Sequence, residues 1–146
     1  MARLLSALLV VLALAACGKS GQDSYADDFP PIDRDLAALG SDVEATLRSA
    51  DTASNAALAR SFAGDAKRLG GIRDRLDELD PPASLKAEHA RLAAAATATE
   101  RALGDLAGAA RSGDAATANA AATRLVRSGQ VIDSARQKIA NSANLH

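Results

Sequence analysis

Residues 84–114, SLKAEHARLAAAATATERALGDLAGAARSGD, are the stretch that decides the fold. Apolar and small side chains recur there at alternating steps of four and three residues, the spacing of a helix face that packs on another helix. The positions on that face are Leu85, His89, Leu92, Ala96, Thr99, Leu103, Leu106 and Ala110. Ser84 is placed to cap the helix, and Gly113 with Asp114 supplies a helix-ending glycine and the cap of a following helix. The stretch predicts a helix over 84–112 and a tight reversal into an antiparallel neighbour.

The same spacing continues on both sides of this stretch. After the reversal it predicts a helix over 114–140, with inward positions Ala118, Ala121, Leu125, Ser128, Ile132, Ala135 and Ile139. Before it, a helix over 54–79 ends firmly at Asp80-Pro81-Pro82. Its inward positions are Leu58, Phe62, Ala66, Leu69, Ile72, Leu76 and Leu79. Gly70-Gly71 lies inside this helix and predicts a kink, a close helix crossing or local fraying.

A further helix is predicted over 32–50. Its apolar positions fall at steps of three and four: Ile32, Leu36, Leu39, Val43, Leu47 and Ala50. Residues 51–55 are rich in capping side chains and predict a turn. An alternative break at Gly64-Asp65 would instead leave one long helix over 32–63.

Four amphipathic helices with short connections predict an all-α fold over 32–146. The economical arrangement is an antiparallel up-down-up-down four-helix bundle. The many alanines on the inward faces allow helix axes to approach to about 8 Å.

Residues 17–31 separate this domain from the N-terminal segment. They are polar, contain glycine and serine, and end in Pro30-Pro31, which predicts a flexible tether that reaches up to about 45 Å when extended. Tyr25 and Phe29 are two of the three aromatic residues in the chain. They either pack back on the domain or form a contact peptide.

Residues 1–16 have the layout of a secretory signal peptide. Arg3 precedes an apolar run from Leu4 to Ala16, which as a helix reaches only about 20 Å against the ~30 Å of a bilayer core. The run ends in Leu14-Ala15-Ala16-Cys17, and Cys17 is the only cysteine.

This ending resembles the lipobox of bacterial lipoproteins, in which an aliphatic residue and two small residues precede a cysteine. The resemblance implies that Cys17 is lipidated and, after cleavage of 1–16, becomes the acylated first residue of an extracytoplasmic protein anchored to a membrane of the cell envelope. Gly18 and Lys19, with no Asp beside the cysteine, resemble lipoproteins forwarded to an outer membrane. The alternative is an ordinary cleaved signal that uses Ala13-Leu14-Ala15 and leaves a free thiol.

Charge and composition limit the partners. Without residues 1–16, the chain carries 16 basic and 18 acidic side chains, and only 2% of the full sequence is aromatic, with no Trp. Nucleic-acid binding needs a clustered positive field and stacking platforms, so nucleic acid is not expected as a partner. The membrane, through the lipid, and a protein partner are the expected contacts.

His89 is the one residue that suggests binding chemistry. An imidazole on an inward helix face can bind heme or a metal, but the residues three and four positions away, Leu85, Lys86, Leu92 and Ala93, are poor ligands. The competing interpretation is a histidine at the bundle end that bonds a loop carbonyl or a carboxylate of the first helix. No cofactor, metal or catalytic residue is assigned, and an enzyme is not expected.

The domain also resembles alanine-rich helical lipoproteins, through Asp80-Pro81-Pro82 followed by Leu85 and His89, and through Gly113-Asp114. That resemblance implies no activity. The sequence therefore predicts a lipid-anchored helical protein that serves as an interaction or envelope-structural module. A bundle that binds a small molecule, heme or a metal is the alternative.

Overall fold

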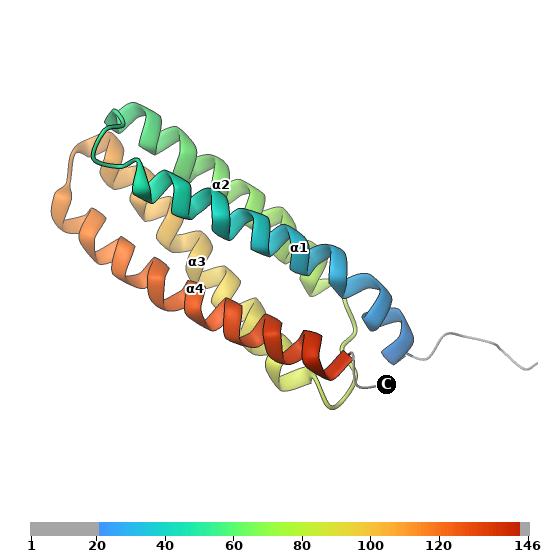
Figure 1. The fold of residues 1–146 in the computed structure, drawn as a ribbon. Helices are drawn as coiled ribbons and strands as arrows, with labels where there is room; N and C mark the ends of the chain where they lie inside the picture. The colour runs from blue at the N-terminus through green and yellow to red at the C-terminus, as the bar shows by residue number, and fades with distance from the viewer. Residues whose placement is uncertain (1–20, 144–146) are drawn as a thin grey trace, which may run out of the picture.

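The computed structural model describes residues 21–143, which form four α-helices and the turns that join them (Figure 1). The helices are α1 (Gly21–Arg48), α2 (Asn55–Asp77), α3 (Lys86–Ser112) and α4 (Ala115–Ala143). Each runs antiparallel to the one before it, which confirms the predicted all-α up-down-up-down bundle. The predicted signal peptide and Cys17 lie outside the described residues. None of the described helices is both long enough and apolar enough to cross a membrane.

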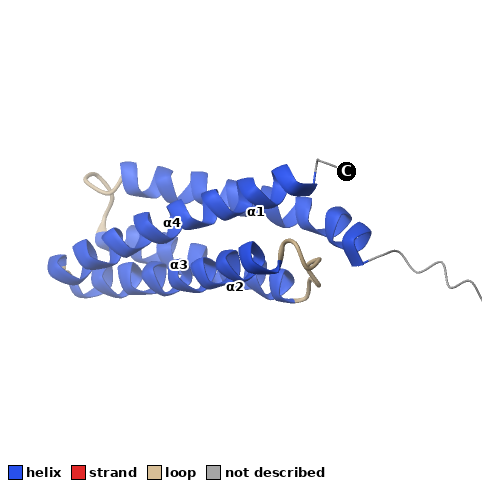
Figure 2. Cartoon of the chain, turned by 90° about the horizontal axis from the view of Figure 1, so that it is seen from below, coloured by secondary structure: helices blue, strands red, loops and turns tan. Residues whose placement is uncertain are grey.

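The core is centred on α3. This helix packs extensively against α4 and α2, whereas α1 and α4 make the smallest contact. Figure 2 shows α1 and α4 side by side above α2 and α3. Leu92, Ala96 and Leu103 have no exposed surface, and the other positions predicted to face inward on this helix are buried except the half-buried Ala110. The 84–114 pattern therefore marked the central helix correctly.

The reversal between α3 and α4 has the predicted chemistry. Gly113 ends α3 in the left-handed conformation, with φ 71°. Asp114 then caps α4, because its Oδ1 accepts a hydrogen bond from the backbone N–H of Thr117 at 3.0 Å. Hydrogen bonds from Thr117 also hold the pKa of Asp114 below its ordinary value.

The start of α3 differs from the prediction. The helix begins at Lys86, and Leu85 rather than Ser84 occupies the cap position, with no side-chain hydrogen bond. The backbone N–H of Leu85 instead bonds the carbonyl of Pro82 at 2.8 Å, which closes a turn and directs the buried Leu85 into the core. Local turn geometry and burial of one leucine outweigh the capping preference of serine here.

The first two helices are separate, as the turn predicted near 51–55 requires. Ser54 caps α2 by accepting a hydrogen bond from the backbone N–H of Ala57 at 3.2 Å. The alternative break at Gly64-Asp65 is wrong, because both residues lie inside α2. Gly70 also lies inside α2, and a Cβ there would come within 3.3 Å of Glu100 Oε1 on α3. The helix continues through Gly70-Gly71 to Asp77, so the predicted fraying is wrong, and at Gly70 the carboxylate of Glu100 occupies the space beside the backbone.

The prediction of a flexible tether over 17–31 is wrong for residues 21–31. These residues form the first turns of α1, and Pro30 and Pro31 lie within the helix. The inward stripe that begins at Ile32 continues backwards by three and seven residues to Phe29 and Tyr25, which are 3% and 2% exposed. Burial of two aromatic rings offsets the cost of the proline pair.

Candidate functional site

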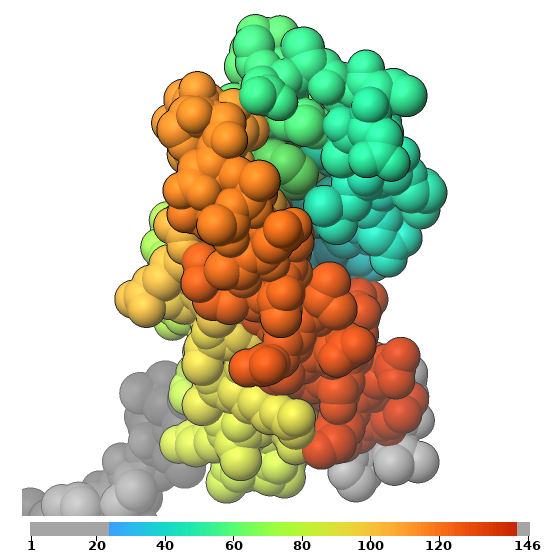
Figure 3. Space-filling view, turned by 90° about the vertical axis from the view of Figure 1, so that its left-hand side faces the viewer, coloured from blue at the N-terminus to red at the C-terminus, as the bar shows by residue number. Residues whose placement is uncertain are grey.

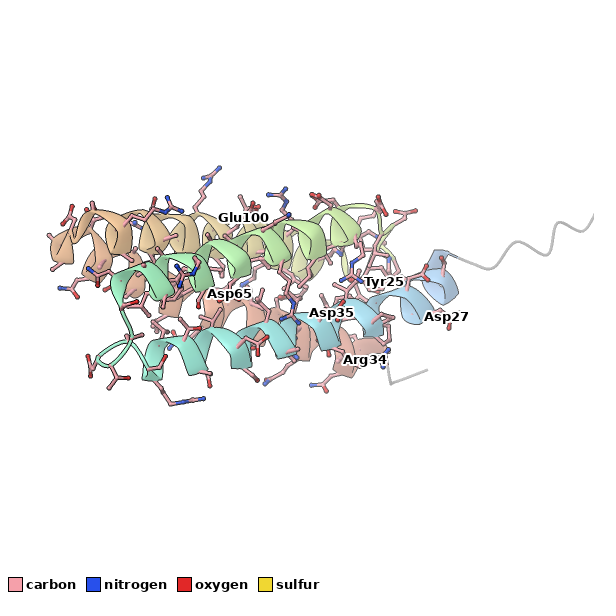
Figure 4. All side chains as sticks on the ribbon, turned by 90° about the horizontal axis from the view of Figure 1, so that it is seen from above. Tyr25, Asp27, Arg34, Asp35, Asp65 and Glu100 are labelled. Carbon is pink, nitrogen blue, oxygen red and sulfur yellow. The ribbon has the colours of Figure 1, made fainter. Side chains whose placement is uncertain are left out.

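Tyr25 and His89 form a buried pair at one end of the bundle. The hydroxyl of Tyr25 lies 3.0 Å from Nδ1 of His89, and the two rings meet edge to face with centroids 5.6 Å apart. Phe29 stacks on Tyr25 from the next turn of α1, at 5.5 Å. Tyr25 lies near the start of α1 (Figure 4). The expectation that His89 sits at a bundle end is correct, but its partner is a tyrosine hydroxyl, neither a loop carbonyl nor a carboxylate.

Burial keeps both groups uncharged. It lowers the pKa of His89, although the carboxylate of Asp77 acts in the opposite direction. It raises the pKa of Tyr25. With ordinary values near 6.5 and 10, the pair is neutral across the intervening pH range. Neither residue lines either of the two grooves described below, and the contact between them holds α1 on α3.

His89 has no set of metal ligands around it. Among residues 21–143, no three His, Cys, Asp or Glu side chains come together where they could share a metal ion. The nitrogen of His89 that faces α1 is occupied by Tyr25. The histidine singled out by the sequence therefore has a stabilising contact in the structure.

A groove lies between α1 and α4 and reaches the core. It has a volume of about 250 Å³. Leu36, Leu39, Val43 and Leu47 of α1 form one wall, Leu125, Val126 and Ile132 of α4 form the other, and Leu69 and Leu103 form the floor. Figure 3 shows the opening between blue-green α1 and orange α4.

Two glycines widen this groove. Gly40 on α1 and Gly129 on α4 both line it, and a Cβ added to either would meet no atom within 4 Å. Val126 stands at the rim with 55% of its surface exposed, and it is the only large hydrophobic residue of the described chain so exposed. The groove is therefore open apolar surface of the kind that marks binding sites.

The polar groups of the groove lie at its rim or are already bonded. Glu44, Gln130 and Asp133 are exposed at the edge. Thr99 also lines the groove, but its hydroxyl donates a hydrogen bond to Ser128 Oγ at 2.7 Å. No titratable side chain reaches the floor, so the site is built to hold an apolar group.

A salt bridge closes the groove at one end. Arg136 Nε on α4 lies 2.6 Å from Asp33 Oδ1 on α1, and both side chains are largely shielded from solvent. A second bond at 3.1 Å joins Arg136 to Asp133. Beyond this clamp α1 and α4 diverge toward the α1–α2 turn, as Figure 3 shows.

Asp65 is a half-buried carboxyl of α2 whose pKa is also shifted. Its Oδ2 is buried without a hydrogen-bond partner. Burial raises the pKa of this carboxyl, nearby Asp42 raises it further, and Arg68 opposes both. Arg68 is itself bound to Asp42 at 2.6 Å. Asp65 does not line the α1–α4 groove, so it adds no chemistry to that site.

The sequence contained a partial signal for these features. Extending the α1 stripe backwards by its own period reaches Phe29 and Tyr25, and so would have predicted the partner of His89. The groove had no comparable signal, because it depends on how far α1 stands from α4, which the period of neither helix determines. Gly40 and Gly129 become informative only once the two helices are placed face to face.

Comparison with known proteins adds no further assignment. The chain matches no protein-family model, and the searches found no similar curated protein or solved structure. The class of protein is therefore set by the fold alone, an antiparallel four-helix bundle.

Proposed function

We propose that this chain is a lipid-anchored, extracytoplasmic interaction module of the bacterial cell envelope, and that its docking surface is the α1–α4 groove. The observation that carries the proposal is the open apolar groove, with Val126 exposed at its rim. The lipobox-like sequence at Cys17 supports the anchoring part of the proposal.

The partner element that fits this groove is an amphipathic helix with basic flanks. From Leu36 to Leu47 the α1 wall is about 16 Å long, which corresponds to three turns of a partner helix. The acidic side chains Glu44 and Asp133 stand exposed at the rim, where each pairs with an arginine of its own helix, Arg48 and Arg136. Lys or Arg beside an apolar stripe would complement these charges.

The groove proposal is tested by filling the site. Gly129→Leu places a side chain in the groove where no atom obstructs it, and replacing a helical glycine also favours the helix. Gly104→Leu is the matched control, because Gly104 is exposed on α3 outside the groove and a Cβ there also meets no atom.

The measurement is site-specific photo-crosslinking in intact cells. A photoreactive residue replaces Val126 at the rim, and a second strain carries it at Arg60, which is exposed on α2. We expect one discrete envelope protein to crosslink at 126 and not at 60, and Gly129→Leu to abolish the product while Gly104→Leu retains it. Equal crosslinking at both positions, or a product unaffected by Gly129→Leu, would contradict the groove as the docking surface.

The anchor is tested separately. In cells fed labelled palmitate, Cys17→Ala should lose the label and leave the membrane fraction, whereas Ser20→Ala should retain both. An unlipidated Cys17→Ala chain that stays with the membrane would show that another contact holds it there. Wild-type chain without label would refute lipidation.

A small apolar molecule is the second candidate occupant of the same groove. The observation in its favour is the volume of about 250 Å³, which exceeds the ~150 Å³ of an engineered apolar cavity that binds benzene. Saturable binding of the neutral dye N-phenyl-1-naphthylamine by the purified Cys17→Ala chain, lost in Gly129→Leu and retained in Gly104→Leu, would favour this occupant.

A further inference from the structure

A second groove runs along the outer face of α3 and α4, independent of the α1–α4 groove. It is shallow, with a volume of about 560 Å³. Alanines and Val131 form its floor, and four arginines from the two helices border it: Arg91, Arg101, Arg124 and Arg127. Apolar methyl groups and guanidinium groups thus share one surface.

Two of these arginines are already engaged. Arg124 is bound to Asp105 at 2.7 Å, and Arg91 lies 3.8 Å from Glu88. Arg101 and Arg127, by contrast, make no hydrogen bond or ion pair with any residue in the range 21–143. Both are exposed.

The register of the helices places Arg101 and Arg127 together. Thr99 is bonded to Ser128 on one side of them, and Asp105 is bonded to Arg124 on the other. In an antiparallel pair these two links put residues 101 and 127 at the same level. Two unpaired guanidinium groups therefore stand at one height, from facing helices, on the same groove.

The charge distribution of the whole bundle adds to the local positive charge of Arg101 and Arg127. Residues 21–80 carry thirteen acidic and seven basic side chains, whereas residues 81–146 carry five acidic and eight basic ones. The bundle thus has an acidic half and a basic half, and Arg101 and Arg127 lie in the basic half. A pair of guanidinium forks in such a field is suited to a phosphate group.

We propose that Arg101 and Arg127 together bind the phosphate group of an amphiphilic phosphate ester, with its apolar part lying on the alanine floor of the groove. The floor argues for an amphiphile over inorganic phosphate, because Ala94 and Ala98 present exposed methyl groups beside the arginines. A phospholipid in a membrane and a soluble lysophospholipid share this chemistry.

The test uses the mature chain with Cys17→Ala, so that no acyl chain contributes to binding. Calorimetry compares lysophosphatidic acid with a monoacylglycerol of the same acyl chain, both below their micelle-forming concentrations. The variant is Arg101→Gln with Arg127→Gln. The control is Arg60→Gln with Arg111→Gln, which removes the same charge from two exposed positions outside the groove.

We expect lysophosphatidic acid to bind roughly tenfold more tightly than the monoacylglycerol, because charge-assisted hydrogen bonds reach only the phosphate. The Arg101/Arg127 double variant should lose roughly that factor, and the control should change by less than about twofold. Helical circular dichroism and the melting temperature should stay at the wild-type level in both.

Vesicles distinguish the source of the phosphate. Binding to phosphatidylglycerol vesicles, and not to phosphatidylcholine vesicles, in addition to the soluble amphiphile assigns the group to a membrane lipid. Binding to the soluble amphiphile alone assigns a free ligand. Equal affinity for the two amphiphiles, or equal losses in the variant and the control, would overturn the proposal, and tighter binding of an acidic helical peptide would assign the groove to a protein partner instead.

Discussion

Removing the hydroxyl of Tyr25 should destabilise the bundle measurably, although the hydroxyl is a single oxygen atom. Tyr25 is 2% exposed, and its hydroxyl lies 3.0 Å from Nδ1 of His89. Tyr25→Phe keeps the ring and its stacking on Phe29 but leaves the imidazole nitrogen buried without a partner. An unsatisfied buried group of this kind costs about 1–3 kcal/mol. Tyr25→Ala should cost more, about 3–5 kcal/mol, because it also opens a cavity.

The assay is urea unfolding followed by circular dichroism at pH 8, where both partners are neutral. The control is the double variant Tyr25→Phe, His89→Leu, in which both polar groups are replaced. Its stability should recover toward wild type, because no orphaned nitrogen remains. A Tyr25→Phe chain within about 0.3 kcal/mol of wild type, or a double variant whose loss is the sum of the single losses, would refute the role of this bond.

The same pair contributes to how the free energy of unfolding depends on pH. Burial lowers the pKa of His89 in the folded chain, so the unfolded chain binds more protons once the pH falls below about 6.5. The contribution of His89 is therefore fully present above that pH and is lost as the pH falls toward the lowered pKa. The raised pKa of Tyr25 acts at the other end, because the unfolded chain releases its proton first above about pH 10. His89→Leu should remove the loss between about pH 6.5 and the onset of carboxylate protonation.

Two further substitutions test the packing of α3 and its end. Leu103→Ala should lower the free energy of unfolding in urea by about 2–5 kcal/mol, because Leu103 has no exposed surface. Val126→Ala at the exposed rim is the control, and its free energy of unfolding should stay within about 0.5 kcal/mol of wild type. Similar losses in both variants would mean that the burial is misassigned. Gly113→Ala should lower the melting temperature by the equivalent of about 1 kcal/mol, because φ is 71° there and a Cβ is unfavourable; an unchanged temperature would argue against the left-handed cap.

The helices could be predicted because burial in a bundle repeats with the helical period. Leu92, Leu103 and Leu106 recur in the sequence at helical steps, and residues at such steps lie on one face of a helix. The pattern therefore identified these buried positions directly. The reversal at Gly113-Asp114 could be predicted equally well, because the left-handed conformation and the helix cap both depend on residue type. These predictions needed only local information.

The errors arose where a long-range contact overrode local preference. Pro30-Pro31 and the polar residues around them favour an irregular segment when considered alone. The aromatic rings of Tyr25 and Phe29 pack against the bundle end and extend the helix through the prolines. His89, whose partner lies 64 residues away in sequence, could not reveal that contact by its own neighbours. The spacing between α1 and α4, and with it the groove, is set by such contacts too.

The start of α1 at Gly21 shortens the segment between the proposed lipid anchor and the bundle. With α1 beginning at Gly21, the chain from Cys17 to the bundle covers four residue steps and reaches at most about 14 Å, in place of about 45 Å. A lipid on Cys17 would then hold the Tyr25–His89 end of the bundle next to the membrane. The groove wall from Leu36 to Leu47 lies about 22–39 Å from the start of α1, so the docking surface would be separated from the lipid by that length of helix. The buried Tyr25–His89 contact therefore sets the distance between anchor and groove, because it keeps the first turns of α1 folded on the bundle.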